Sequence, residues 1–327
     1  AAPADAGDSG PVVCALLAVD DALYTYVLSA LLIAVGLYLT VRTRAVQFRH
    51  FGTMLRTIAS SRTGAAGGIS SFQAFAISLA ARVGIGNVFG VAAALMFGGP
   101  GAIFWMWVSA ILGMTTKYAE GLLAIKYRTT DENGEIAGGP MYYIQNGLGD
   151  KFKWLAKLFA FFGAVTALLG SGTFPQVHAI TESVSTSFHL PVLLVGAIIT
   201  IMTAVVTLGG IKSISKVAEF IVPFMALFFV GGSVLILVWN CKVIPATFGR
   251  IFACAFSKES VLGGTAGTAV ISFMTAMRMG VARGVYTNEA GLGSSPIVAA
   301  AAKTNSCVKQ GLISMTSVFF TTIVVCT

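Results

Sequence analysis

The chain has 327 residues, of which 56% are hydrophobic and only 10% are charged, and its mean hydropathy is +0.84. No soluble globular domain of this length has such a composition, so the soluble enzymes and soluble binding domains are excluded. The net charge of +8 does not indicate nucleic-acid binding, because the basic residues are dispersed over short loops on one side of the predicted topology.

The N-terminal segment, residues 1–21, is small, polar and acidic, and it lacks the n-region and h-region of a signal peptide. It begins without Met, which predicts a processed or incomplete start. Residues 22–41 form the first predicted membrane span, since the run reaches the roughly 20 apolar residues that a bilayer requires. The arginines that follow it are Arg42, Arg44, Arg49, Arg56 and Arg62. Basic loops face the cytoplasm, so the N-terminus is placed outside.

The second predicted span, residues 70–98, is expected to be interrupted near its middle, where Arg82, Gly84, Gly86 and Asn87 occur. Two glycines and a polar amide weaken a helix at that depth. Lipid cannot satisfy the backbone groups that a break leaves open, so a break is tolerated only against protein or a wet cavity. There it supplies amides and carbonyls for ligands and ions. This pattern predicts a transporter.

The third predicted span, residues 102–127, carries Lys117 and Glu120 three residues apart, for which a local helical ion pair is the simplest interpretation. The amphipathic piece at 138–144 is too short to cross and is placed at the inner interface. The fourth, fifth and sixth spans are predicted at about 151–186, 191–209 and 217–239, and the eighth begins near Val308.

The seventh predicted span, residues 264–286, is again expected to be interrupted, at residues 278–284. It crosses in the opposite direction from the second span, and paired interrupted helices in two inverted halves indicate a secondary transporter's binding site. The predicted organisation is an outer segment, extra helix and basic loop (1–69), a first five-helix repeat (70–239), an outer loop (240–263) and the start of an inverted repeat (264–327). Because the second repeat is incomplete, the chain is expected to be a fragment.

Three blocks of sequence resemble the sodium:alanine (alanine or glycine:cation) symporter family. They are VGIGNVFGVA followed by GGPGAIFWMWVSAILG at 98–113, GGPMYYIQNGLG at 138–149 and RGVYTNEAGLGSSPIVAAAA at 283–302. The resemblance covers nearly the whole chain after the first span. It implies an all-α polytopic membrane protein with a LeuT-like five-plus-five inverted repeat, one extra N-terminal helix and a truncated second repeat. It also implies symport of alanine or glycine with sodium, by alternating access, into the cell across the plasma (inner) membrane.

The first interruption carries the predicted substrate and sodium sites. Freed N–H groups at Gly84, Ile85, Gly86 and Asn87 would hold an amino-acid carboxylate, helped by the positive end of a half-helix. The predicted sodium ligands are freed carbonyls near Ala81, Val83 and Gly84 and the amide oxygen of Asn87. In the alternative interpretation these glycines only permit close helix packing.

Ile85 departs from the family pattern, which commonly has Thr or Ser between the two glycines. A hydroxyl that would bind ligand or ion is therefore missing. The alternatives that follow are a proton-coupled amino-acid carrier and a transport-deficient paralogue.

Further predicted substrate contacts are Gln176, Thr268, Ser272 and Phe273. Thr268 or Ser272 would bond the ammonium or carboxylate, and Phe273 would limit the size of the substrate side chain. Packing is an equal alternative for Phe273, as is an interhelical hydrogen bond for Gln176.

Charges within membrane spans are costly and indicate function or pairing. Arg82, Arg278, Arg283 and Glu289 are predicted to form an inner gate network. Arg82 is expected to pair with a carboxylate such as Glu182, and the alternative is that it attracts the substrate carboxylate.

No cofactor or enzymatic activity is predicted, because His50, His178 and His189 form no metal-binding pattern and no catalytic His/Asp or Ser/His set is found. A channel would need a polar-lined pore rather than paired helix breaks. The predicted partners are a small neutral amino acid, sodium and the lipid bilayer. Three cysteines, Cys14, Cys241 and Cys254, fall outside, which permits one disulfide among them.

Overall fold

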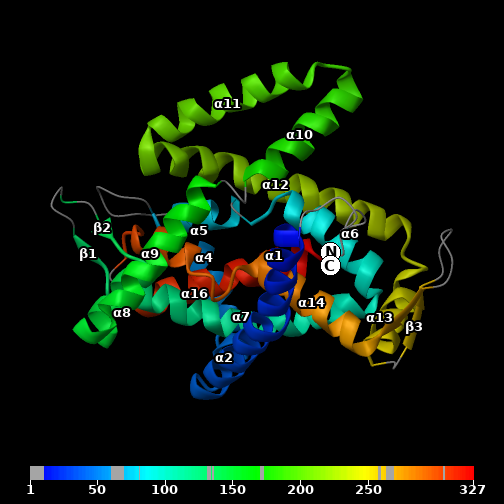
Figure 1. Ribbon diagram of the computed structural model, residues 1–327, viewed down its shortest axis with the longest axis horizontal. Helices are drawn as coiled ribbons and strands as arrows, with labels where there is room; N and C mark the ends of the chain where they lie inside the picture. The colour runs from blue at the N-terminus through cyan, green and yellow to red at the C-terminus, as the bar shows by residue number, and fades with distance from the viewer. Residues whose placement is uncertain are drawn as a thin grey trace.

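The computed structural model describes residues 11–59, 70–80, 82–130, 134, 136–169, 173–256, 259–262, 269–304 and 306–327. These residues are predominantly helical, with two short antiparallel strand pairs, which confirms the helical fold class (Figure 1). Ala81 and Thr268 lie outside the described residues.

The chain begins with consecutive helical segments: α1 (Pro11–Ala22), the π-helix η1 (Leu23–Leu28) and α2 (Ser29–Arg42). Helical structure therefore starts before the predicted first span. Gly36 lets α2 approach α7 closely, because a Cβ added there would lie 2.9 Å from the Cβ of Leu112. Two short helices follow, α3 (Val46–Arg49) and α4 (Phe51–Ala59).

The second predicted span consists of two helices, α5 (Ser71–Ala80) and α6 (Ile85–Gly98), so the predicted interruption is confirmed. A reciprocal capping box starts α5: the Ser70 hydroxyl accepts from the Gln73 N–H at 3.1 Å, and the Gln73 side chain accepts from the Ser70 N–H at 2.8 Å. Gln73 also donates to Glu219 on α12 at 2.7 Å, which ties the start of α5 to a distant part of the chain.

The long helix α7 (Gly101–Lys126) matches the third predicted span (Figure 1). It packs against α2, α13 (Ile244–Phe256), α14 (Phe273–Asn288) and α16 (Cys307–Val318). Small residues permit these close approaches. A Cβ added at Gly101 would lie 2.6 Å from the Cys254 carbonyl oxygen, and one at Gly121 would lie 2.8 Å from the Ser314 Cβ. Glycines along α7 thus bring elements from both ends of the sequence together.

The middle of the chain forms the hairpin β1 (Thr129–Thr130) and β2 (Ile136–Ala137), then α8 (Pro140–Leu148), the 3₁₀-helix η2 (Asp150–Phe152), α9 (Lys153–Leu168), α10 (Thr173–Phe188), α11 (Val192–Leu208) and α12 (Gly210–Trp239). In Figure 1, α10 and α11 stand apart at the top of the view. Leu193 and Leu208 are 86% and 88% exposed. Large exposed apolar surfaces of this kind mark membrane or protein contacts.

Two helical segments in the described part of the chain are long and apolar enough to cross a membrane: Ser213–Trp239 and Cys307–Val325. The second consists of α16 (Cys307–Val318) and the π-helix η3 (Phe319–Val325), and its start agrees with the predicted start of the eighth span near Val308.

The predicted second interruption, at 278–284, is wrong. These residues lie inside one continuous helix, α14 (Phe273–Asn288). Gly280 and Gly284 serve close packing on α7 instead: a Cβ at Gly280 would lie 2.7 Å from the Trp105 Cβ, and one at Gly284 would lie 2.7 Å from the Ser109 hydroxyl. Small residues four apart on a helix allow two backbones to approach in this way.

The non-helical residues of this region come before α14 instead. The strand β3 (Glu259–Leu262) pairs antiparallel with β4 (Ala269–Ser272), so Ser272 lies at the end of a strand, directly before the helix starts at Phe273. After α14, a turn with left-handed residues leads to the short helix α15 (Ser294–Ala300).

Candidate substrate site and buried charge cluster

The backbone between α5 and α6 leaves the helical hydrogen-bond pattern at Gly84. The N–H groups of Arg82 and Val83 both donate to the Leu79 carbonyl, at 3.1 and 2.8 Å, and the Gly84 N–H turns back to the Arg82 carbonyl at 3.0 Å. Gly84 is extended, with φ −144° and ψ −166°. The first N–H groups of a helix lie at the positive end of its dipole and lack helical acceptors. Of the N–H groups predicted to be free, however, those of Gly84 and Asn87 are bonded, to the carbonyls of Arg82 and Gly84.

Asn87 lies in that first turn of α6 and is only 3% exposed. Its N–H donates to the Gly84 carbonyl at 3.0 Å, whereas its side-chain Nδ2 has no hydrogen-bond partner within the described part of the chain. An unsatisfied buried donor costs about 1–3 kcal/mol, which makes this amide a candidate to donate to a ligand. The sequence-predicted Ile85 and Gly86 are the residues before it, at the start of the helix.

Gln176 comes from α10 and meets the interruption directly. A Cβ added at Gly84 would lie 3.6 Å from the Gln176 Nε2. The structure therefore brings together Gln176, Gly84 and the start of α6. The Val83 side chain points elsewhere, into an apolar cluster with Phe75 and Val222.

Phe273 packs on α7, where its ring meets that of Trp105 edge to face with centroids 5.5 Å apart. In this structure Phe273 therefore packs against a neighbouring helix, as the alternative interpretation expects.

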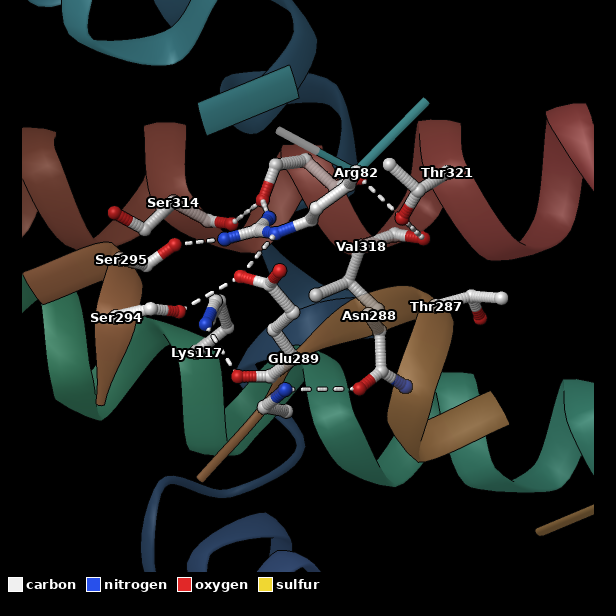
Figure 2. A network of polar contacts seen from close by, with 12 residues as sticks. Arg82, Lys117, Thr287, Asn288, Glu289, Ser294, Ser295, Ser314, Val318 and Thr321 are labelled. Carbon is white, nitrogen blue, oxygen red and sulfur yellow. Dashed lines mark hydrogen bonds and ion pairs between the residues drawn. The ribbon is translucent and has the colours of Figure 1, made fainter. Parts of the chain in front are cut away.

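Arg82 is buried beside the interruption, with 1% of its side chain exposed. Its guanidinium pairs with the Glu289 carboxylate, with an Nε–Oε2 distance of 3.4 Å, and donates to the hydroxyls of Ser295 and Ser317 (Figure 2). The expected partner Glu182 is wrong: it is exposed on α10 and lies 3.6 Å from His178. Arg82 thus joins the interruption to α15 and α16.

Lys117 on α7 is fully buried, and its Nζ lies 2.8 Å from Glu120 Oε2, which confirms the predicted local pair. The pair has further contacts: Lys117 Nζ donates to the Glu289 carbonyl at 2.7 Å, and Glu120 Oε1 accepts from the Gly291 N–H at 2.8 Å. On α8, outside the spans, burial and then the Glu120 charge raise the pKa of Tyr143, so its phenol stays neutral. We call Arg82, Lys117, Glu120 and Glu289 the buried charge cluster.

The predicted gate network is only partly assembled. Arg82 and Glu289 meet, but Arg283 contacts α6, where a Cβ at Gly90 would lie 3.1 Å from its Nη1, and it also covers the Tyr286 ring at 5.7 Å. Arg278 lies earlier on α14. The charged residues that contact the Glu289 region, besides Arg82, are Lys117 and Glu120 rather than the predicted Arg278 and Arg283. Their cluster contacts were missed because a spacing of three within one helix suggested a purely local pair.

Cys14, Cys241 and Cys254 are not joined by a disulfide in the described part of the chain, so the permitted disulfide is not formed in this structure.

Comparison with known proteins places these features in a family. The chain matches the sodium:alanine symporter family over residues 12–327. It is 49% identical over 312 residues to an uncharacterized transporter of Haemophilus influenzae, covering 95% of this chain and 67% of that one. It is 48% identical over 301 residues to the sodium/alanine symporter AgcS of Methanococcus maripaludis, covering 91% and 65%.

A third relative is the amino-acid carrier protein AlsT of Bacillus subtilis, 38% identical over 298 residues, with 91% of this chain and 61% of the relative covered. The chain therefore spans about two thirds of the length of these relatives. All three are described as transporters, symporters or carriers rather than as enzymes. A match over nearly the entire chain, together with a helix opened at Gly84 beside a buried amide, shows that this multi-pass membrane protein belongs to the sodium:alanine symporter family.

Proposed function

We propose that the protein is a secondary active transporter that imports a small neutral amino acid, alanine or glycine, together with sodium. The observation that carries this proposal is the interruption of helical structure between α5 and α6, next to the buried Asn87, whose Nδ2 has no hydrogen-bond partner among the described residues. The Methanococcus relative, a sodium/alanine symporter, supports the choice of ion and substrate.

The substrate carboxylate binds the N–H groups at the start of α6, because a helix N-terminus offers both donors and a positive dipole end. Asn87 Nδ2 and Gln176 add side-chain contacts to it. Sodium, which prefers oxygen ligands, binds carbonyls of the interruption and the Asn87 amide oxygen. Thr268 and Ser272 contact the substrate from the second half of the chain.

The fold that we propose for this activity is LeuT-like, with residues 70–239 as the first repeat and residues from 264 onward as the start of an inverted second one. The counterpart of the first interruption is then the non-helical stretch before Phe273 that includes β4. The N-terminus lies outside and the protein resides in the plasma (inner) membrane, as the arginines after the first span favour. Alternating access exposes the site to each side in turn.

Transport is tested with the protein expressed from its complete gene and reconstituted in liposomes. An inward sodium gradient is expected to drive saturable uptake of labelled alanine, and an equal potassium gradient is not. Uptake driven by a proton gradient without sodium would support the proton-coupled alternative, and a carrier that binds alanine without moving it would be transport-deficient. Neither of these results is compatible with the proposal.

Asn87→Leu is expected to weaken sodium-dependent alanine binding roughly ten- to hundred-fold, because it removes hydrogen bonds to charged groups that are worth about 1.5–3 kcal/mol. Titration calorimetry with purified protein measures the affinity. Asn240→Leu is the matched control, since Asn240 is exposed at the end of α12 and bonds only locally to Ile236. Equal alanine affinities of the two variants would show that Asn87 does not bind the substrate or sodium.

Ile85→Thr is expected to restore a hydroxyl at the position where the family commonly has one. One additional oxygen ligand is worth about 1 kcal/mol, so the sodium concentration for half-maximal alanine binding should fall about five-fold. Ile198→Thr, on the exposed face of α11, is expected to leave it unchanged. If Ile85→Thr instead left the sodium dependence unaltered or weakened it, residue 85 would not contribute to the ion site.

A further inference from the structure

One buried cluster joins two irregular segments that lie far apart in the sequence. Arg82 belongs to the interruption between α5 and α6, whereas its partner Glu289 begins the turn between α14 and α15, 207 positions later. Figure 2 shows Arg82 and Glu289 pointing toward one another between α16, α7 and this turn. The position of the first interruption is therefore linked directly to the shape of the turn.

The turn is held in an unusual conformation. Glu289 has φ 50°, a left-handed value that is uncommon for a residue other than glycine, and Gly291 and Gly293 have φ 88° and 80°. Such strain persists only where the surroundings over-determine the backbone. Here Lys117 holds the Glu289 carbonyl and Glu120 holds the Gly291 N–H, so two side chains of α7 fix the backbone on both sides of Ala290.

The signs of these charges match the helix ends that they face. The Lys117 ammonium contacts the Glu289 carbonyl just after the C-terminal end of α14, where the helix dipole is negative. The Glu120 carboxylate contacts the Gly291 N–H on the side of the turn that leads to the start of α15, where the dipole is positive. Ser294 adds a donor to the Glu289 carboxylate at 2.7 Å, which fixes the oxygen that Arg82 contacts. Ser294 at the carboxylate and Lys117 at the backbone carbonyl thus both orient Glu289 for its contact with Arg82.

Burial argues against a gate at this place. The side chains of Arg82, Lys117 and Glu120 are 1%, 0% and 9% exposed. Separating them would leave unpaired charges inside the protein, which costs far more than an ion pair at the surface. The Glu289 side chain is 24% exposed, but separating it from Arg82 would leave the buried guanidinium without its carboxylate.

We propose that Glu289 is a positioning residue for the substrate site: through Arg82, the buried charge cluster sets the course of the main chain at 82–87, whose groups bind the substrate and sodium. This inference rests on the proposed function. It replaces the predicted gate by a fixed connection between the first interruption and the α14–α15 turn. Glu289 contacts neither substrate nor sodium in this account and acts only through Arg82.

The test uses hydrogen–deuterium exchange of the full protein in lipid nanodiscs, followed by mass spectrometry of peptides that contain residues 82–87. Glu289→Gln removes the charge with little change of shape. Amides 82–87 are expected to exchange at least about ten-fold faster, and alanine affinity at saturating sodium to fall about ten-fold, since the buried Arg82 guanidinium loses the negative charge that it pairs with. Peptides from α11 should not change.

Glu182→Gln is the matched control, because Glu182 pairs on the exposed face of α10, and it is expected to change neither quantity. Ser294→Ala is a milder variant that keeps the test available if Glu289→Gln fails to fold, and it should shift both quantities about three-fold in the same direction.

The inference is overturned if Glu289→Gln or Ser294→Ala lowers the melting temperature while exchange at 82–87 and alanine affinity stay as in the unmodified protein. That result would assign the cluster to stability alone. If the unmodified protein binds no alanine with sodium, the proposed function fails, and the exchange rates at 82–87 still decide whether Glu289 positions this segment.

Discussion

Lys117→Met is expected to lower the free energy of unfolding by about 3–5 kcal/mol, the cost of leaving one partner of a buried ion pair unpaired. Methionine fills a similar volume, so the loss reports the charge rather than a cavity. Glu120 would keep its bond to the Gly291 N–H but lose its cation, and the Glu289 carbonyl would lose its donor. Thermal and denaturant unfolding in detergent micelles, followed by circular dichroism, measures the change.

The same substitution at Lys153 is the control. Lys153 lies 2.8 Å from Asp150 with the same spacing of three residues, but the two side chains are 48% and 87% exposed. Solvent screens such a pair, so Lys153→Met is expected to change stability by no more than about 0.5 kcal/mol.

The double variant Lys117→Met with Glu120→Gln should recover at least half of the loss, because it removes the unpaired charge and keeps an acceptor for Gly291. Equal stabilities of the two lysine variants would contradict the description of the cluster.

Gly280→Val is expected to destabilise the protein by at least about 2 kcal/mol, because overpacking at a close helix contact forces the backbones apart. A Cβ at this position would meet the Ala102 carbonyl and lie 2.7 Å from the Trp105 Cβ, and neither atom is the end of a flexible side chain. Unfolding monitored by tryptophan fluorescence is a direct measurement, since Trp105 lies at the contact.

Gly163→Val on α9 is the matched control, because a Cβ there would meet nothing within 4 Å. Valine has a somewhat better helix propensity than glycine, so this variant is expected to be neutral or slightly stabilising. If Gly280→Val were as stable as Gly163→Val, the contact between α14 and α7 would not be the close packing that the structure shows.

Hydrophobicity and glycine placement predict much of the fold. The apolar runs locate α7 and α11 closely, because a helix in a bilayer needs an apolar run of defined length. For α12 they locate the end at Trp239, whereas the helix starts at Gly210 rather than at the predicted residue 217. The first interruption is predicted correctly, since Gly84, Gly86 and Asn87 combine poor helix formers with a polar side chain in an apolar run.

The same reasoning fails at 278–284, because Gly280 and Gly284 pack against α7 and sequence composition cannot distinguish a packing glycine from a helix break. Only the partner helix reveals the difference. In the site, the sequence suggests Gln176 as a substrate contact and the structure places it beside Gly84.

The partners of the buried charges could not be predicted. Arg82 meets Glu289 across 207 positions, and no local spacing encodes a contact of that range. Lys117 and Glu120 were recognisable as a pair because they lie on one helix, yet their bonds to the α14–α15 turn depend on tertiary packing. One signal was available: the run NEAGLGSSP at 288–296 combines an acidic residue with two glycines, which favours an irregular backbone around a charge.

The most direct test of the central claim measures hydrogen exchange of the unmodified protein with sodium alone, alanine alone, and both together. If the open backbone between α5 and α6 binds the two ligands jointly, amides 82–90 should become strongly protected only when both are present. Protection that spares residues 82–90, or that alanine produces equally well with choline replacing sodium, would contradict the account.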